Sequence, residues 1–227
     1  MIAILGAMQE EIEPILKSVK EYKEIEYAKN KFYLANYASN ELVIAYSKIG
    51  KVNAAITATV MIEKFNASRL LFTGVAGALS HGLKIGDLMF ATSLLQHDLD
   101  ITAFGHPHGY VPGIEIFTKT DSDLNDIAKQ TAEQKGLILK SGIIATGDIF
   151  VCEASKKEWI KDTFKADVVE MEGASVAQVC SQLGVPFFVL RAISDEAGGG
   201  AEFDFDEFLA SSAKVSADFV LSMVEKL

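Results

Sequence analysis

The chain has 227 residues, with 21 basic and 31 acidic side chains and a formal net charge of −10, and its length suits one large domain with a sizeable core. Hydrophobic residues make up 49% and charged residues 23%, a balance that excludes an intrinsically disordered chain. The acidic balance argues against a nucleic-acid-binding protein, because neutralising phosphates requires a basic face.

The N-terminal segment shows neither a basic leader nor a long apolar span. Its apolar start ends at Met8 and acidic residues follow at once. The longest uncharged run, 173–190, is interrupted by Gly184 and Pro186, which is typical of a helix, a turn and a strand rather than a membrane span. We therefore expect a cytoplasmic protein without a membrane partner.

No residue spacing in the chain is typical of a metal centre. Cys152 and Cys180 lack the spacing of zinc ligands or of a disulfide framework, so we expect free thiols. His106 and His108 flank a proline in a polar segment, where solvated side chains are more common than metal ligands. We expect no metal ion and no other cofactor.

The first half of the chain combines apolar runs with helical patterns. Short apolar runs bounded by glycine or polar turns predict strands. Acidic residues and Pro14 follow the first such run and predict a helix that ends near Val19. Two or three strands follow, and a later stretch that is apolar nearly all round predicts a buried helix. The expected strands are 2–5, 32–37, 42–47, 70–75 and 88–95, and the buried helix is 54–65.

The second half begins with a polar segment, 96–113, that carries three of the four histidines. Regular alternation of helical and strand patterns then continues to the C-terminus, and the last helix has its apolar residues on one stripe. This alternation implies an α/β fold with a mostly parallel sheet. No linker or repeat divides residues 1–227, so we predict a single domain. The expected elements are strands at 143–146, 168–171 and 186–193, and helices at 121–134, 154–164, 172–183 and 208–227.

Candidate site residues follow the predicted strands. In open α/β sheets, ligands bind outside the carboxyl ends of the strands. Carboxylates, one arginine, one aromatic ring and flexible backbone follow five of the strands, which predicts a negatively charged site at that edge. These residues are Met8, Glu10 and Glu11 after the first strand, then Gly77, then Phe150 and Val151, then Glu170, Met171 and Glu172, and finally Arg191, Ser194 and Asp195.

Two of these segments are hard to explain as structure alone. Glu170 and Glu172 stand where a buried strand passes into an apolar helix, with no Lys or Arg nearby in the sequence. Burying an unpaired carboxylate costs roughly several kcal/mol. A hydroxyl-rich ligand such as a ribose would supply the hydrogen bonds that these two carboxylates need. Asp195 ends an apolar strand, where desolvation favours the protonated form of a general acid.

Other segments have simpler interpretations. Glu10, Glu11 and Glu13 are, on the residues alone, more typical of a helix N-terminus than of catalysis. The glycines of 74–77 fail the dinucleotide-binding pattern, and Gly50 with its following lysine lacks the rest of a P-loop. Both nucleotide-phosphate interpretations are therefore rejected.

Five motifs follow one another along the chain: GAMQEEIE, TGVAGAL, ATGDIFV, VVEMEGASVAQVC and VLRAISDEA, the last followed by FDEFL. Together they resemble the 5′-methylthioadenosine/S-adenosylhomocysteine nucleosidases of the nucleoside phosphorylase superfamily. The resemblance runs from Met1 to Leu227 in motif order and spacing, and VEMEG with RAISD is its most specific part. It implies a single-domain, three-layer α/β/α fold with a central mixed, partly barrel-like sheet. It also implies a homodimer that works without a metal or an organic cofactor.

The resemblance also implies catalytic roles. Glu11 matches the acid that activates the attacking water, and Asp195 matches the acid that protonates the purine at N7, with Ser194 orienting it. Glu172 matches the carboxylate that holds the ribose hydroxyls, and Met171 packs against the sugar. A carboxylate near the sugar and a protonated acid near the base suit glycosidic cleavage, because positive charge builds on the sugar and negative charge on the base.

The remaining implied roles concern binding. Phe150 matches the ring that stacks on adenine, Val151 the backbone that reads its edge, and Phe205 the lining of the 5′-substituent pocket. Met8, Gly77, Glu170 and Arg191 are further candidates for substrate binding. Ile101, Phe104 and Pro112 match positions that reach across the dimer into the neighbouring site. Val75 departs from the family pattern, since many relatives have serine there, and Gln9 replaces a frequent glutamate.

The resemblance predicts hydrolysis of 5′-methylthioadenosine and S-adenosylhomocysteine, and also of 5′-deoxyadenosine, with a role in methionine salvage. Similar enzymes also cleave 6-amino-6-deoxyfutalosine in bacteria that make menaquinone by the futalosine route. We further hypothesise that the glycine-rich loop around 198–200 admits bulky 5′-groups. The alternatives are a purine nucleoside phosphorylase, which needs a phosphate site, and a catalytically silent nucleoside-binding protein.

Overall fold

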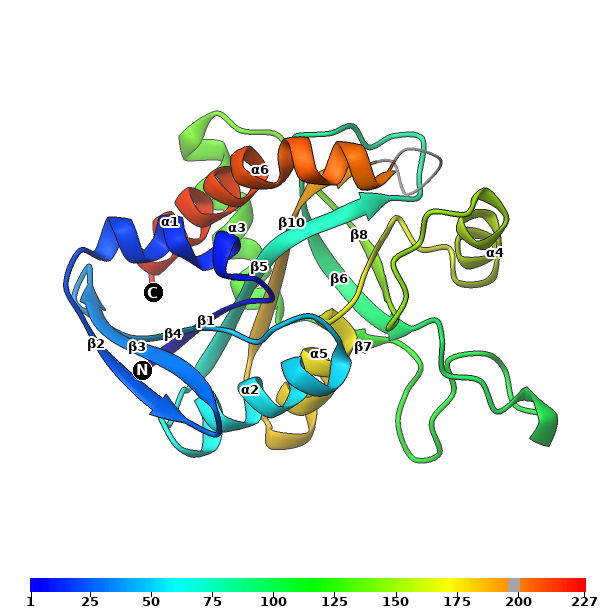
Figure 1. The fold of residues 1–227 in the computed structure, drawn as a ribbon, viewed down its shortest axis with the longest axis horizontal. Coiled ribbons are helices and arrows are strands. Elements are labelled where there is room, and N and C mark those ends of the chain that lie inside the picture. The colour runs from blue at the N-terminus through cyan, green and yellow to red at the C-terminus, as the bar shows by residue number, and fades with distance from the viewer. Residues whose placement is uncertain (196–200) are drawn as a thin grey trace.

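The computed structural model describes the backbone of residues 1–195 and 201–227 and the side chains of 1–195 and 208–227. Strands and helices alternate along much of the chain (Figure 1). The strands are β1 (Ile2–Gly6), β2 (Tyr22–Tyr27), β3 (Asn30–Tyr37), β4 (Asn40–Tyr46), β5 (Arg69–Ala78), β6 (Leu88–Gln96), β7 (Thr118–Lys119), β8 (Leu139–Thr146), β9 (Val168–Glu170) and β10 (Phe187–Asp195). The helices are α1 (Gln9–Val19), α2 (Lys51–Glu63), η1 (Thr102–Phe104), α3 (Ser122–Lys135), α4 (Ala154–Phe164), α5 (Gly173–Leu183) and α6 (Ala201–Val224).

One sheet runs through the described strands in the order β10-β6-β8-β9-β5-β1-β4-β3-β2, with β7 paired to β6. An additional pairing joins β10 to β5, so that β5, β9, β8, β6 and β10 close into a ring while β1, β4, β3 and β2 extend from it as an open sheet. This arrangement confirms the partly barrel-like sheet that the resemblance implies. Closure also brings the ends of strands that are distant in the sequence around one opening.

The expectation of a mostly parallel sheet is wrong, because antiparallel pairings are as frequent as parallel ones. The pairs β2–β3 and β3–β4 are antiparallel since two-residue turns join them, and such turns can connect only antiparallel neighbours. The turn residues Ala28, Lys29, Ala38 and Ser39 all have positive φ. That geometry normally favours Asn-Gly or Asp-Gly, so these four residues gave no recognisable hairpin signal.

Helices cover both faces of the sheet, which confirms the three-layer α/β/α arrangement. Helices α2 and α5 pack on one face, where Met61 and Val176 join the strands in one apolar cluster. Helices α1, α3 and α6 pack on the other face, around Ile12 and Phe219 (Figure 1). Helix α4 packs through Phe164 into a third apolar cluster, which contains Ala145 of β8 and Val169 of β9. Within the described residues, no helix is both long and apolar enough to span a membrane.

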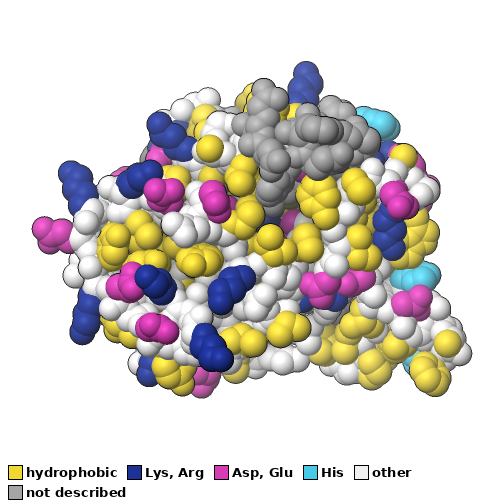
Figure 2. Space-filling model, viewed as in Figure 1, with side chains coloured by type: hydrophobic (Ala, Val, Ile, Leu, Met, Phe, Trp, Pro, Cys, Tyr) yellow, Lys and Arg dark blue, Asp and Glu magenta, His cyan; other side chains and the backbone are white. Residues whose placement is uncertain are grey.

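A long segment between β6 and β7 leaves the body of the molecule, at lower right in Figure 1. It contains η1, and its Phe104 side chain is 81% exposed. Figure 2 shows hydrophobic and histidine side chains on this protruding region. The resemblance had assigned Ile101, Phe104 and Pro112 in this segment to contacts with a neighbouring subunit.

The stability of the fold should be sensitive to the stacked pair Phe90 and Phe188, whose ring centroids lie 6.0 Å apart in the core beneath α6. Because Phe188 is fully buried, we expect Phe188→Ala to lower the free energy of unfolding by about 3–5 kcal/mol, measured by urea denaturation. Ile138→Ala, at a side chain that is 80% exposed, is the control and should change it by less than about 0.5 kcal/mol. Similar losses in the two variants would contradict this view of the core.

Candidate active site

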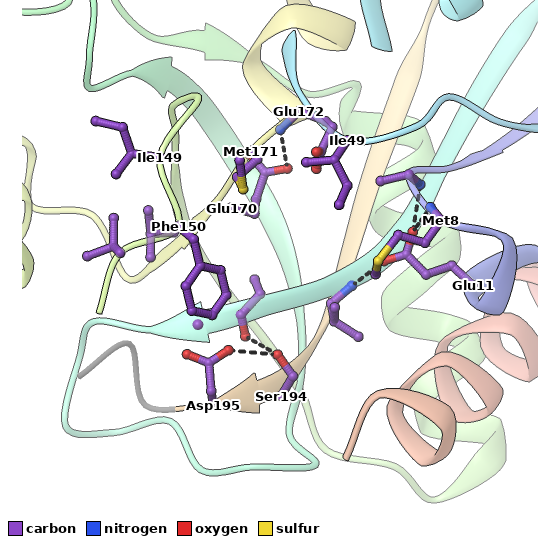
Figure 3. Close-up of a pocket in the computed structure, with 16 residues that line it drawn as sticks. Met8, Glu11, Ile49, Ile149, Phe150, Glu170, Met171, Glu172, Ser194 and Asp195 are labelled. Atoms are coloured by element: carbon purple, nitrogen blue, oxygen red, sulfur yellow. Dashed lines mark hydrogen bonds between the residues drawn. The ribbon is translucent and has the colours of Figure 1, made fainter. Parts of the chain in front are cut away.

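A cavity of about 300 Å³ opens at the ends of the strands and is surrounded by residues from six separate segments. They follow or end β1, β4, β5, β8, β9 and β10, which is the edge that the strand-end rule predicted. Figure 3 shows Glu11 and Met8 at one end of the cavity and Phe150 and Asp195 at the other. The lining residues are Ala7, Met8, Glu11, Ile49, Val75, Ala76, Gly77, Ile149, Phe150, Val151, Val169, Glu170, Met171, Glu172, Ser194 and Asp195.

Glu11 is held rigidly by backbone amides. Its Oε2 accepts hydrogen bonds from the amides of Ala7 at 2.6 Å and Met8 at 3.0 Å, and its Oε1 accepts one from Val75 at 3.1 Å. The residue lies in the first turn of α1 and folds back over the start of that helix. Gly74 is needed beside it, because a Cβ there would meet the carboxylate. Glu11 therefore accepts backbone amides next to the N-terminus of α1 and also lines the cavity.

Burial raises the pKa of Glu11 above its ordinary value, whereas the Arg191 guanidinium and the three amides act in the opposite direction. Burial favours the protonated carboxylic acid, and the guanidinium and amides favour the carboxylate. By contrast, Glu10 and Glu13 in the same helix are exposed, as the simpler interpretation of the sequence expected. Only Glu11 of the three faces the cavity.

Glu170 has the cation partner that the sequence did not reveal. Arg191 Nη2 lies 2.7 Å from Glu170 Oε2, and both side chains are almost completely buried. The same Oε2 accepts the amides of Glu172 and Gly173, and Oε1 accepts the Thr146 hydroxyl. Glu170 therefore has a cation partner within the chain, and its burial does not require a ligand as compensation. The partner comes from β10, 21 residues further along the chain.

Arg191 itself is not among the residues that line the cavity. Its guanidinium packs over the Phe72 ring at 4.0 Å and donates to the Leu190 carbonyl at 3.1 Å, behind the cavity wall. The side chain is 1% exposed. Arg191 is thus a fixed positive charge beneath the site, with Glu170 between it and the cavity.

Glu172 differs from its neighbour in having few internal partners. Its Oε1 accepts the amide of Gly50 at 2.8 Å. Burial, followed by repulsion from Glu170, raises the pKa of Glu172 to about 8, although the Gly50 amide and Arg191 oppose the shift. Near neutral pH, this carboxyl group therefore carries a proton in a large fraction of molecules.

Ser194 and Asp195 end β10 and are both buried. The Ser194 hydroxyl lies 2.9 Å from Asp195 Oδ2 and 3.5 Å from the Ala76 carbonyl (Figure 3). The hydroxyl thereby limits the orientation of the Asp195 carboxyl group. The sequence placed both residues at this strand end, and the structure brings them to the cavity.

The rest of the wall is apolar. Phe150 and Ile149 are half-exposed at the rim, whereas Val151 is buried. Ile49 lines the cavity from the loop between β4 and α2, and sequence reasoning missed it. The strand-end rule would have found Ile49 had it been applied to the strand predicted at 42–47.

Besides Arg191, three predicted residues that the structure describes do not line this cavity. Ile101, Phe104 and Pro112 lie in the protruding segment between β6 and β7. Phe205 and the glycine-rich loop around 198–200 lie outside the residues whose side chains are described. Among the described residues, no group of three His, Cys, Asp or Glu side chains could hold a metal ion.

The sequence and the fold match known proteins. Residues 1–225 match the family model described as the phosphorylase superfamily. The chain belongs to this superfamily.

Relatives within the phosphorylase superfamily are similar over their whole length. An aminodeoxyfutalosine nucleosidase of Campylobacter jejuni is 62% identical over 226 residues, which cover 100% of this chain and 99% of the relative. A 5′-methylthioadenosine/S-adenosylhomocysteine nucleosidase of Staphylococcus carnosus is 44% identical over 228 residues, 100% of both chains. A solved Helicobacter pylori variant with 5′-methylthioadenosine in its active site is 50% identical, with a TM-score of 0.98 over 100% of this chain and 98% of that one.

The raised pKa of Glu172 gives a stability test. A carboxyl group whose pKa rises from 4.5 to about 8 on folding contributes its full stability below pH 4.5 and loses it as the pH rises through 8. We therefore expect Glu172→Gln to gain stability relative to the native chain between pH 5 and pH 9, by at least about 1.4 kcal/mol, the equivalent of one pKa unit. Urea denaturation at both pH values measures the difference.

Glu13→Gln is the matched control, because Glu13 is an exposed glutamate on α1. Its stability difference from the native chain should be the same at the two pH values. A Glu172→Gln difference that stays constant with pH would show that burial does not hold a proton on Glu172.

Proposed function

We propose that this protein is a nucleosidase that hydrolyses the N-glycosidic bond of 5′-methylthioadenosine and S-adenosylhomocysteine and releases adenine. The observation that carries the proposal is one cavity with a buried carboxyl group at each end, Glu11 and Asp195, and Met171 and Glu172 between them. The full-length similarity to nucleosidases supports it. We include 5′-deoxyadenosine among the substrates, and also 6-amino-6-deoxyfutalosine, because the Campylobacter relative bears the name aminodeoxyfutalosine nucleosidase.

In the proposed reaction, Glu11 acts as the base. Its carboxylate takes a proton from water as the water oxygen forms a bond to the anomeric carbon of the sugar. The three amides and Arg191 favour the carboxylate form that this step needs, against the effect of burial. Because the amides fix the carboxylate from behind, its orientation toward the cavity costs no rearrangement during the reaction.

Asp195 acts as the acid at the other end. Its carboxyl group donates a proton to N7 of the purine while the bond between the base and the sugar breaks, so adenine leaves as a neutral molecule. Ser194 keeps the carboxyl group oriented through their hydrogen bond. Phe150 stacks on the adenine ring, and the backbone of Val151 reads its edge.

Glu172 holds the ribose hydroxyls, and Met171 packs against the sugar. Positive charge that develops on the sugar is stabilised by the Glu11 carboxylate. We propose positioning roles for Glu170 and Arg191, since each is already engaged by the other and Arg191 does not line the cavity. Met8 and Gly77 are proposed as contacts of the sugar and the base.

Phosphorolysis is the less favourable alternative. A phosphate needs cations or converging amides, but the amide of Val75 is occupied by Glu11 and Arg191 is paired with Glu170. The carboxylate of Glu11, the proposed base, lines the cavity and would repel the anion. A catalytically silent binding protein is also less favourable, because binding alone gives no reason for a buried carboxyl group at each end of the cavity.

Further parts of the proposal rest on the family resemblance. They are one catalytic domain over 1–227, a homodimer in the cytoplasm, and a role in methionine salvage and in removing by-products of S-adenosylmethionine. Ile101, Phe104 and Pro112 would complete the neighbouring subunit's site, and the exposed position of Phe104 is compatible with this. Phe205 would line the pocket for the 5′-substituent.

The first test is adenine release from 5′-methylthioadenosine with and without phosphate, with the sugar product followed by mass spectrometry. We expect free methylthioribose at the same rate in both buffers, because the cavity favours water over an anion. A phosphorylated sugar that appears only with phosphate would identify a phosphorylase instead. No adenine in either buffer would favour the silent binding protein.

The second test removes the two proposed catalytic groups. Glu11→Gln and Asp195→Asn should each lower kcat by about 10²–10⁴-fold, the usual contribution of general acid–base catalysis. Substrate binding, measured by calorimetry, should persist in both variants. Glu13→Gln removes the same kind of charge from the exposed face of α1 and should leave kcat unchanged. Full activity in Glu11→Gln would exclude Glu11 as the base.

A further inference from the structure

Three charged side chains form a cluster beside the cavity that the proposed reaction does not use: Lys51, Asp98 and Asp148, here called the Lys51 cluster. Lys51 Nζ lies 2.7 Å from Asp98 Oδ1, and Asp98 Oδ2 accepts the backbone amide of Asp148 at 2.9 Å. The Lys51 and Asp98 side chains are only 17% and 16% exposed. A partly buried pair of this kind is screened less than a surface ion pair.

The Lys51 cluster joins three loops that are distant in the sequence. Lys51 is the first residue of α2, Asp98 follows β6, and Asp148 follows β8. Gln96 adds a further acceptor, 3.1 Å from Lys51 Nζ. The loops at the ends of β4, β6 and β8 are thus fastened together by side chains rather than by strand pairing.

The N-terminus of α2 connects the Lys51 cluster to the cavity. Two successive amides at this terminus bind two carboxylates: Lys51 N–H donates to Asp148 Oδ1 at 2.8 Å, and Gly50 N–H donates to Glu172 Oε1 at 2.8 Å. Gly50 has a φ of +99°, and a Cβ there would lie 3.1 Å from Asp148 Oδ1. Only glycine gives both amides this direction at low cost.

The residues next to the Lys51 cluster form part of the cavity wall. Ile49 precedes Gly50, and Ile149 and Phe150 follow Asp148. Figure 3 shows Ile49 beside Glu172. Any movement of the loop between β4 and α2 would therefore shift Ile49 and release the amide that holds the Glu172 carboxyl group.

We propose that the Lys51 cluster is a positioning device: it holds the Gly50 amide on Glu172 and so aims the Glu172 carboxyl group at the ribose hydroxyls. This inference rests on the proposed function and deepens it. Lys51, Asp98 and Asp148 do not line the cavity. They act through Gly50, so their removal should weaken recognition of the sugar hydroxyls more than the chemistry at the base.

The test compares two substrates that differ in one hydroxyl. We expect Lys51→Met to lower kcat/KM for 5′-methylthioadenosine by at least about tenfold, because the Glu172 carboxyl group loses its fixed direction. The 2′-deoxy analogue lacks one of the hydroxyls that Glu172 holds, so its kcat/KM should fall much less. Lys51→Arg keeps the charge and should recover most of the loss.

Lys129→Met is the matched control, since it breaks the exposed Lys129–Asp126 pair on α3 and removes the same charge. Both substrates should react with it as with the native chain. Equal losses for the two substrates in Lys51→Met would reveal general structural damage, and no loss at all would show that the cluster does not position Glu172. Either result overturns the inference while the proposed function stands. A native chain that cleaves neither substrate would overturn both.

A second measurement does not depend on activity. The Gly50 amide lowers the pKa of Glu172 against the effects of burial and Glu170, so losing that hydrogen bond should raise this pKa further. The folded-state pKa sets the pH at which the stability gain of Glu172→Gln over its parent levels off, so in the Lys51→Met background this upper end should move upward. An unchanged pH window would contradict the link between the Lys51 cluster and Glu172, whatever the substrate proves to be.

Discussion

Burial of several carboxyl groups around one guanidinium is the constraint on which the site depends. Glu11, Glu170 and Glu172 are each at most 7% exposed, and burying carboxylates without compensation is costly. Arg191 supplies the compensation from behind the wall, paired with Glu170 and packed on Phe72. Because β10 pairs with both β5 and β6 where the barrel closes, the guanidinium is fixed by the sheet itself. The strand pairing that closes the barrel therefore also places the positive charge that compensates these carboxyl groups.

Backbone amides carry the rest of the compensation, and most of them belong to helix N-termini. Glu11 accepts amides at the start of α1, Glu170 accepts those at the start of α5, and Glu172 accepts one at the start of α2. Helix N-termini attract negative charge because their first amides lack intrahelical partners. The three helices thus support the cores on both faces of the sheet and aim carboxyl groups into one cavity. Stability and site geometry cannot be changed separately at these positions.

Sequence reasoning found this edge of the sheet because apolar strands ending in polar residues leave a local signal. It could not find the Glu170–Arg191 pair, since the two side chains meet only after the strands associate. The sequence also did not indicate the two hairpins, because Ala28 and Ala38 in their turns adopt positive φ although neither residue favours it. The apolar strand before Asp195 already indicated a general acid, but the role of Glu11 as the base came from the family resemblance, because on the residues alone Glu11 is typical of a helix N-terminus.

The structure explains why identical side chains in one cavity can have different chemistry. Burial raises the pKa of both Glu11 and Glu172. At Glu11 the Arg191 guanidinium and three amides oppose that shift, whereas at Glu172 repulsion from Glu170 adds to it and one amide and Arg191 oppose it. Both are buried, so the two groups differ in their partners rather than in their exposure to solvent. Different partners are how one residue type can take different tasks in one site. At Glu172 the amide partner is held by loops tied together beside the site, which is why the Lys51 cluster, outside the cavity, belongs to the explanation of what happens inside it.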